Sequence, residues 1–325
     1  MTLQTLKNQD ALKAAEHFLR ICVQRGLAHS FDTVSGTWVK PYPEVTGYIL
    51  SYFADHYPRR MKDWMSSGDT LVDLQGQAGG FASFYDPEYL YAFDTAQIMH
   101  GLLSLYRHTK EKRYLASAVR AGEFLQYMQL NGGLMFPLFN AHEGSRIVYQ
   151  PNSDASNWGS TFSYIQVKNA EGLQLLAKIT GDKRYQQSAL ALAEFPVRRI
   201  DYSYTHPLAY YLEGLWSMGK TTQVKQILEQ KIIPRLKDGG FIPYFPKAAY
   251  AYTSGSIQLA ILLAKTKHLY EARQILTWAQ KVQSHHGSGG LFQYALPSGE
   301  PDGTIHREIN SWGTKYFAEL LRLVN

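Results

Sequence analysis

Carboxylates stand at the beginnings of several apolar segments, and two of them in one cleft would suffice for acid and base chemistry. Glu44 precedes VTGYIL, Asp94 precedes TAQIMHGLL, and Glu308 precedes INSW. Cleavage of a glycosidic bond requires one carboxylic acid to protonate the leaving oxygen and one carboxylate to act as base or nucleophile. Asp94 and Glu308, with Glu44 in reserve, are therefore candidate catalytic residues.

His206 and Arg307 suit a different chemistry, the removal of a proton from a sugar carbon. In an epimerase or lyase that acts on uronic acid units, a base takes the C5 proton while a cation or hydrogen-bond donor neutralises the sugar carboxylate. His206, Arg307 and the tyrosines of this chain could fill these roles. The sequence leaves cleavage and proton removal both open.

Each candidate also has a purely structural interpretation. An aspartate at a helix start is a favoured N-cap, worth typically about 1 kcal/mol, so Asp94 could serve only as a cap. Glutamate is a poorer cap, which favours function for Glu44 and Glu308. His206 stands before Pro207 and could be an ordinary loop histidine.

Aromatic residues make up 14% of the chain, with 23 Tyr and 6 Trp, well above ordinary usage. Tyr and Trp combine a large apolar face with a polar end, which suits a cleft that binds sugar rings. The alternative is aromatic packing between helices. The residues predicted to bind substrate are Trp38, Tyr42, Tyr91, Trp158, Tyr204, Tyr252 and Trp312.

The charge and cysteine content exclude several classes of protein. The net charge is +6, but the basic residues are scattered, which indicates attraction of acidic ligands such as an acidic polysaccharide rather than nucleic-acid binding. The single cysteine, Cys22, excludes a disulfide framework and a cysteine-rich zinc site. No zinc spacing such as His-Glu-x-x-His occurs, and the glycine pairs have no phosphate-binding context, so neither a metal nor a cofactor is expected.

The chain as given is expected to be cytoplasmic, unless a signal peptide has been removed. Its first residues lack the basic and apolar regions of a signal peptide. No apolar run is long enough to cross a bilayer. The oligomeric state is left open.

Apolar residues recur at helical spacing along the whole chain, and glycines or prolines interrupt them. Loops rich in aromatic residues separate many of these segments. The predicted helices cover residues 9–24, 44–53, 59–74, 94–107, 113–129, 161–180, 183–198, 207–216, 221–236, 253–264, 269–283 and 308–324.

An internal repeat organises these helices into pairs. Gly-Gly recurs in AGGF (78–81), NGGL (131–134), DGGF (238–241) and SGGL (288–291), with a period on the order of fifty residues. The odd helices carry charges and the even ones are almost uncharged beyond their first turn, which places the even ones inside. Six such pairs predict an all-α (α/α)6 toroid in one domain, residues 1–325, with short strands at most in the loops. All inner helices would begin at one mouth, where the candidate residues would meet.

Two phrases, YPEVTGY (42–48) and FDTAQ (93–97), together with the Gly-Gly-aromatic loops, resemble the six-hairpin glycosidase superfamily. More narrowly, they are similar to helical-toroid proteins of bacterial exopolysaccharide biosynthesis, which resemble the helical domain of glucuronyl C5-epimerases. The likeness covers nearly the whole chain and implies activity on, or binding of, acidic or neutral polysaccharide. Ala96 stands where the common pattern often has Gly. The spacing around the acids of the hydrolases is not reproduced, so no catalytic pair is transferred.

Three functions follow from these observations. The first is a carbohydrate-active enzyme of bacterial polysaccharide metabolism that cleaves glycosidic bonds through paired carboxylates. The second is a uronate C5-epimerase or lyase, and the third is a non-catalytic polysaccharide-binding component of an exopolysaccharide assembly system. Two carboxylates facing each other across roughly 5–10 Å would favour hydrolysis. A Tyr–His–Arg cluster without such a pair would favour epimerase or lyase chemistry.

Overall fold

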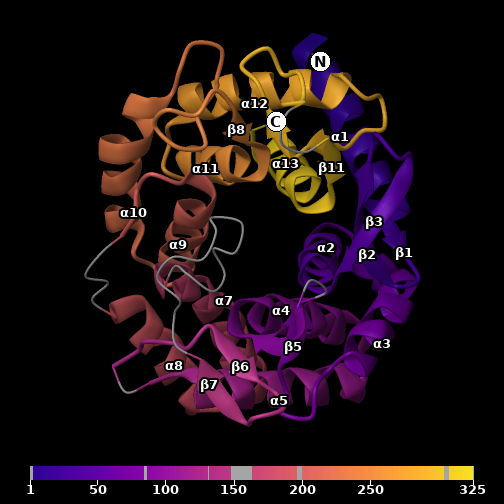
Figure 1. The fold of residues 1–325 in the computed structure, drawn as a ribbon, viewed down its shortest axis with the longest axis vertical. Coiled ribbons are helices and arrows are strands. Elements are labelled where there is room, and N and C mark those ends of the chain that lie inside the picture. The colour runs from indigo at the N-terminus through magenta and orange to yellow at the C-terminus, as the bar shows by residue number, and fades with distance from the viewer. Residues whose placement is uncertain are drawn as a thin grey trace.

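Helices alternate between an inner and an outer ring in the computed structural model, which describes residues 3–83, 86–130, 132–147, 163–195, 200–303 and 307–324 (Figure 1). The inner ring contains α2 (Pro43–His56), α4 (Ala92–Thr109), α7 (Asn169–Thr180) with the preceding 3-10 segment η3 (Ser163–Lys168), α9 (Thr205–Ser217), α11 (Thr253–Lys265) and α13 (Ser311–Val324). The outer ring contains α1 (Leu3–Ile21), η1 (Pro58–Trp64) with α3 (Met65–Asp73), α5 (Lys112–Met128), α8 (Lys183–Glu194), α10 (Thr221–Ile227) with the irregular turns η4 (Leu228–Ile232) and η5 (Ile233–Arg235), and α12 (Leu269–Ser284).

Burial explains which helices lie inside. Every residue of α11 from Thr253 to Ala264 is buried, whereas α5 is buried only along one stripe. A helix that is apolar on all sides must be covered on all sides, and an amphipathic helix can face water. The prediction of an (α/α)6 toroid with the even helices inside is therefore confirmed.

Short antiparallel strands connect the hairpins at the mouth where the inner helices begin. They are β1 (Val23–Gln24), β2 (Leu27–Asp32), β3 (Thr37–Tyr42), β4 (Phe81–Ser83), β5 (Asp86–Tyr91), β6 (Leu138–Asn140), β7 (Ser145–Ile147), β8 (Ala251–Tyr252), β9 (Leu291–Phe292), β10 (Tyr294–Ala295) and β11 (Glu308–Asn310). Sheet β1-β2-β11-β9, with β3 on β2, joins the first and last hairpins; β4-β5-β6-β7 and β8-β10 join neighbouring ones. Strands confined to the loops are as the sequence predicted.

Threonines in the first turns of inner helices tie the preceding loops to the ring. Each hydroxyl accepts a hydrogen bond from a backbone N–H one or two residues after a glycine of the loop. The three bonds lie at equivalent places in their hairpins. They therefore fix the corresponding loops at the same level relative to the inner helices. The pairs are Ala28 N to Thr46 Oγ1, 2.9 Å, Phe81 N to Thr95 Oγ1, 2.9 Å, and Leu291 N to Thr314 Oγ1, 3.0 Å.

Two predicted helix starts are wrong, and the strands are the reason. Helix α4 begins at Ala92 with Tyr91 as its N-cap, so Asp94 lies inside the first turn and is not the cap. Glu308 does not open the last helix: it belongs to β11, where it pairs with Asp32 of β2. In both places the chain runs directly from a strand into a helix, which patterns of apolar residues do not reveal.

Other predicted boundaries also shift: the first helix, predicted to begin at residue 9, begins at Leu3. Residues 59–74 divide into a 3-10 and an α-helical segment, and residues 221–236 include a π turn and a 3-10 turn. Residues 161–162 and 196–198, at the ends of two predicted helices, lie outside the described residues. Within the described part of the chain, no helix combines the length and apolar character that crossing a bilayer requires.

Replacing Gly289 by Ala is expected to destabilise the ring far more than replacing Gly287. Gly289 has φ +87°, and a β-carbon there would lie 2.2 Å from the carbonyl oxygen of Ala14 in α1. Gly287 also has a positive φ, +73°, but faces open space. An alanine in the left-handed backbone conformation costs about 1–2 kcal/mol at either position. The clash with Ala14 adds to this cost only at position 289. Denaturant unfolding should show the difference, and equal losses for G289A and G287A would contradict the proposed contact.

Candidate active site

Glu44 and Asp94 meet because their helices pack unusually closely. They lie in the first turns of the neighbouring inner helices α2 and α4. A β-carbon at Gly101 would lie 2.5 Å from the Gly47 Cα, so only glycines allow this approach. The two carboxyl groups share a side-chain hydrogen bond. Asp94 is buried. Glu44 is half-buried: it lies deep among protein atoms, but part of the residue is accessible to solvent.

This carboxyl pair shares protons near neutral pH. Burial raises the pKa of Glu44 well above its usual range, and the neighbouring charge of Asp94 raises it further. Burial also raises the pKa of Asp94, to about 7, against the opposing effect of the hydrogen bond from Glu44. Two carboxylates in contact resist joint ionisation. Glu44 therefore keeps its proton and donates it to Asp94, and the pair titrates as one unit.

His206 is a neutral imidazole whose tautomer is fixed by its partners. It is buried in the first turn of α9, and burial lowers its pKa to about 3. Its Nδ1 lies 2.9 Å from Gln258 Oε1, and Gln258 Nε2 lies 3.1 Å from the Glu213 carboxylate. Because a carboxylate only accepts, the nitrogen of Gln258 must face Glu213 and its oxygen must face His206. His206 therefore carries its proton on Nδ1 and a lone pair on Nε2.

Tyr210 lies between His206 and the carboxyl pair. The His206 and Tyr210 rings are 4.6 Å apart, and the charges of Glu44 and Asp94 both act on the Tyr210 hydroxyl. Burial, followed by the charge of Glu44, raises the pKa of Tyr210 far above its usual value, so the hydroxyl stays protonated. A base, a proton donor and a carboxyl pair thus come together at the mouth where α2, α4 and α9 begin.

Two further tyrosines close the axis of the ring beside Tyr210. Tyr48 stacks on Tyr210 at 6.4 Å, and Tyr316 lies 5.9 Å from Tyr48. The Tyr48 hydroxyl approaches that of Tyr210, and this contact adds to burial in raising the pKa of Tyr48. Among the described residues, the hydroxyls of Tyr48 and Tyr316 have no hydrogen-bond partner. Buried hydroxyls normally have one, so these two are available to a ligand oxygen or to water.

Below this tyrosine floor, formed by Tyr48, Tyr210 and Tyr316, a chain of polar contacts continues from His206. Glu213 Oε2 lies 3.2 Å from Lys168 Nζ, which lies 2.5 Å from Glu171 Oε2. Burial alone would lower the pKa of Lys168, but the charges of Glu171 and Glu213 raise it. Lys168 therefore remains a cation held between the two carboxyl groups.

The predicted aromatic residues divide into several groups. Six rings cluster at the mouth, with centroid separations between 4.9 and 6.2 Å: Tyr204, Tyr244, Phe245, Tyr250, Tyr252 and Tyr294. Trp312 packs edge-on against Tyr42 at 5.2 Å, and Tyr91 is buried at the end of β5. Trp38 packs against Phe31 and Phe18, away from these rings, and Trp158 lies outside the described residues.

Glu308 and Arg307 are not brought to the carboxyl pair by any contact in the described residues. Glu308 is half-buried in β11, where its charge acts on Tyr294. Arg307 is exposed. The structure thus joins Asp94 to Glu44, the residue held in reserve, rather than to Glu308. No group of three or more metal-binding side chains occurs in the described part of the chain.

Sequence reasoning missed the residues one and two turns below the helix starts. His206, Tyr210 and Glu213 follow one another at spacings of four and three on α9 and face the ring axis together. Polar groups at helical spacing within an otherwise apolar helix were the available signal. The partners Gln258 and Lys168 come from other helices, and no pattern in the sequence links them to His206.

Comparison with solved structures identifies proteins of the same fold. A cellobiose 2-epimerase from Bacillus thermoamylovorans superposes with a TM-score of 0.75 at 15% identity, covering 99% of both chains. A sugar epimerase from a ruminal bacterium gives 0.73 at 14% identity, covering 98% of this chain and 99% of the other. A D-mannose isomerase gives 0.70 at 12% identity, covering 98% and 96%. At these identities the likeness establishes the fold alone.

Comparisons of the sequence found no match. No family model matches the chain, and no curated protein matches it.

The carboxyl pair should make the protein less stable as pH rises from about 4 to 7. Asp94 has its pKa raised from 3.8 to about 7, so in this window the folded state binds more protons than the unfolded state. The free energy of unfolding must then fall with rising pH. D94N should flatten this slope, because Asn does not titrate. Denaturant unfolding at several pH values measures it, with D10N on the outer surface as control; an unchanged slope in D94N would refute the shared proton.

Proposed function

We propose that this protein is a carbohydrate-active enzyme that moves a proton on a sugar, as an epimerase or isomerase acting beside the carbonyl group. The observation that carries this proposal is that Tyr210 links the neutral, tautomer-fixed His206 to the proton-sharing pair Glu44–Asp94. A neutral base and a weak acid are the two groups that such a transfer needs. The epimerases and isomerase of the same fold support it as analogy.

The geometry of the carboxyl pair favours proton transfer over cleavage. Glycosidases hold their two carboxyl groups about 5–5.5 Å apart when retaining and about 6.5–9.5 Å apart when inverting, so that the sugar and a water fit between them. Glu44 and Asp94 are hydrogen-bonded to each other, which leaves no room for a glycosidic bond. They can act together as one acid, but not as an opposed acid and base.

The site favours a neutral sugar over a uronic acid. A uronate carboxylate would need a cation beside the reacting carbon. Among the described residues, no lysine or arginine contributes to the pKa of Glu44, Asp94 or His206. The net charge of +6 therefore gives no specific support for an acidic substrate at this site.

The chain's own residues suggest the order of events. Nε2 of His206 takes the proton from the carbon next to the carbonyl of an open-chain sugar, and the electron pair moves into the carbonyl to form an enediolate. The proton of the carboxyl pair, or the Tyr210 hydroxyl, stabilises the oxygen. Return of a proton to the opposite face of the same carbon epimerises the sugar, and return to the former carbonyl carbon isomerises it. The aromatic cluster around Tyr252 would hold the sugar ring.

Incubation with cellobiose, mannose and glucose in D2O tests this function. We expect deuterium to replace hydrogen on the carbon next to the carbonyl, and an epimer or isomer of the sugar to form. NMR measures both changes. H206Q should lower the rate by roughly a hundredfold or more, the range typical of a general base, with the fold intact.

Two other results would contradict the proposed proton transfer, and each would indicate a different function. Hydrolysis products without deuterium would indicate cleavage, and Glu308 would then be sought as the partner of the carboxyl pair. Sugar binding, seen as a change in Trp312 fluorescence, without exchange or hydrolysis would indicate the binding-only role in polysaccharide assembly.

Gln258 should matter because it sets the tautomer of His206. Q258L removes the oxygen that accepts from Nδ1–H, so the neutral imidazole is free to move its proton to Nε2 and lose its basic site. We expect the exchange rate to fall at least tenfold. The ¹⁵N chemical shifts of the two His206 ring nitrogens should approach each other, because both tautomers become populated. Q187L, on the exposed face of α8, is the matched control. Unchanged ring shifts in Q258L would show that Gln258 does not fix the tautomer.

A further inference from the structure

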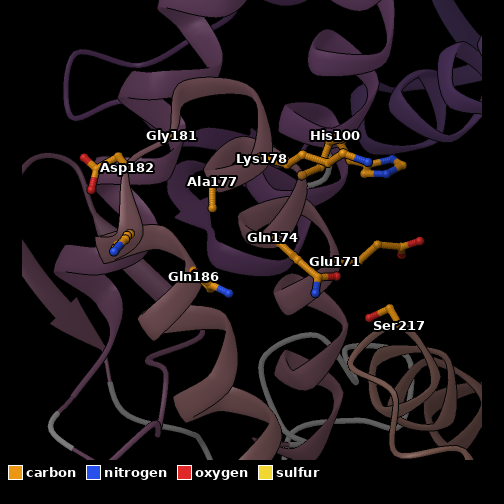
Figure 2. Close-up of a pocket in the computed structure, with 11 residues that line it drawn as sticks. His100, Glu171, Gln174, Ala177, Lys178, Gly181, Asp182, Gln186 and Ser217 are labelled. Carbon is orange, nitrogen blue, oxygen red and sulfur yellow. The ribbon is translucent and has the colours of Figure 1, made fainter.

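A separate cavity opens at the opposite mouth, where the inner helices end. It has a volume of about 600 Å³ and lies between α4, α7, α8 and α9. Figure 2 shows His100, Glu171 and Ser217 pointing into the same space, each from a different inner helix. Neither the carboxyl pair Glu44–Asp94 nor the tyrosines beside it line this cavity. Its volume is in the range of sites that hold small molecules.

The deep wall of the cavity presents hydrogen-bond acceptors. Ser51 Oγ donates to the Gly47 carbonyl and therefore accepts from His100 Nδ1, 2.8 Å away. Burial lowers the pKa of His100, so the ring is neutral and its Nε2 is an acceptor. Burial alone would raise the pKa of Glu171, but the nearby charge of Lys168 lowers it to about 2. Glu171 is thus a carboxylate, and its side chain is 36% exposed.

The rim of the cavity adds donors, beside the carboxylate of Asp182, which is already paired with Arg184. Lys178 and Lys183 carry ammonium groups there, and the side-chain amides of Gln174 and Gln186 both donate and accept. The four residues are exposed. A ligand in this cavity would therefore have to donate to the deep wall and accept from the rim. Hydroxyl groups do both.

Charge narrows the choice of ligand further. Lys168 binds both Glu171 and Glu213, so this trio contains two acidic side chains and one basic side chain. An anion would meet this excess next to Glu171, and a cation would meet the two lysines of the rim. A neutral ligand avoids both repulsions.

We propose that this cavity is a second binding site, for a neutral polyhydroxylated ligand of mono- to disaccharide size, anchored on Glu171 and His100. It does not depend on the proposed catalytic function, because it uses none of the residues at the other mouth. Polar contacts nevertheless connect the two sites. Glu171 binds Lys168, Lys168 binds Glu213, and Gln258 joins Glu213 to His206.

Titration with cellobiose, followed through the imidazole signals of ¹⁵N-labelled protein, tests the proposal. The signals of His100 and His206 are assigned with H100Q and H206Q. We expect the His100 signals to shift saturably with cellobiose. Glucuronate, which is anionic, should shift them at least tenfold more weakly at the same concentration.

A cavity-filling pair of variants locates the site without disturbing the buried ion pair. Q174W places a large ring over the cavity from an exposed position on α7, whereas Q187W adds the same ring on α8 outside the lining. We expect Q174W, but not Q187W, to weaken the His100 shifts at least tenfold, with both melting temperatures near that of the unaltered protein. The site is overturned if cellobiose shifts no His100 signal, if Q174W leaves the shifts unchanged, or if glucuronate binds equally well. Deuterium exchange at the other mouth is judged separately, so failure of one proposal does not imply failure of the other.

Discussion

Contact between loop glycines and the backbone of the next outer helix holds the ring together. In each case φ is positive, which glycine adopts readily, and a β-carbon would collide with a carbonyl oxygen. Gly289 lies in the last hairpin and Ala14 in the first helix, so the contact that spaces neighbouring hairpins also closes the ring. The contacts are Gly79 with Arg120, Gly133 with Ala191, Gly240 with Gln274 and Gly289 with Ala14.

Closure of the ring determines where chemistry can occur. The loops fixed by these glycines lead through short strands into the inner helices, so all six helix starts share one mouth. Pairing of β2 with β11 seals this mouth between the first and last hairpins and draws Glu308 into a strand. Glycines on the inner helices act in the same way: Gly47 against Gly101 brings Glu44 and Asp94 within hydrogen-bonding reach.

Polar groups inside the ring lie along the axis, where no single helix can satisfy them. Lys168 needs both Glu171 and Glu213, and Gln258 needs both Glu213 and His206. Buried ion pairs seldom add net stability over apolar packing, because desolvation offsets their attraction. Their value here is to fix orientation: the hydrogen bond from Gln258 Nε2 to Glu213 turns the oxygen of Gln258 toward His206.

The sequence by itself determined the ring, because helical spacing, glycine pairs and the contrast between charged and uncharged helices are local or periodic signals. It also placed Asp94, Glu44, His206 and Tyr252 near the starts of inner helices, since these starts can be located in the chain to within a few residues. Only the tertiary structure decided that Asp94 pairs with Glu44 rather than Glu308. That choice depends on the distance between neighbouring helices and on the pairing of strands far apart in sequence, which are set by packing and leave no local pattern.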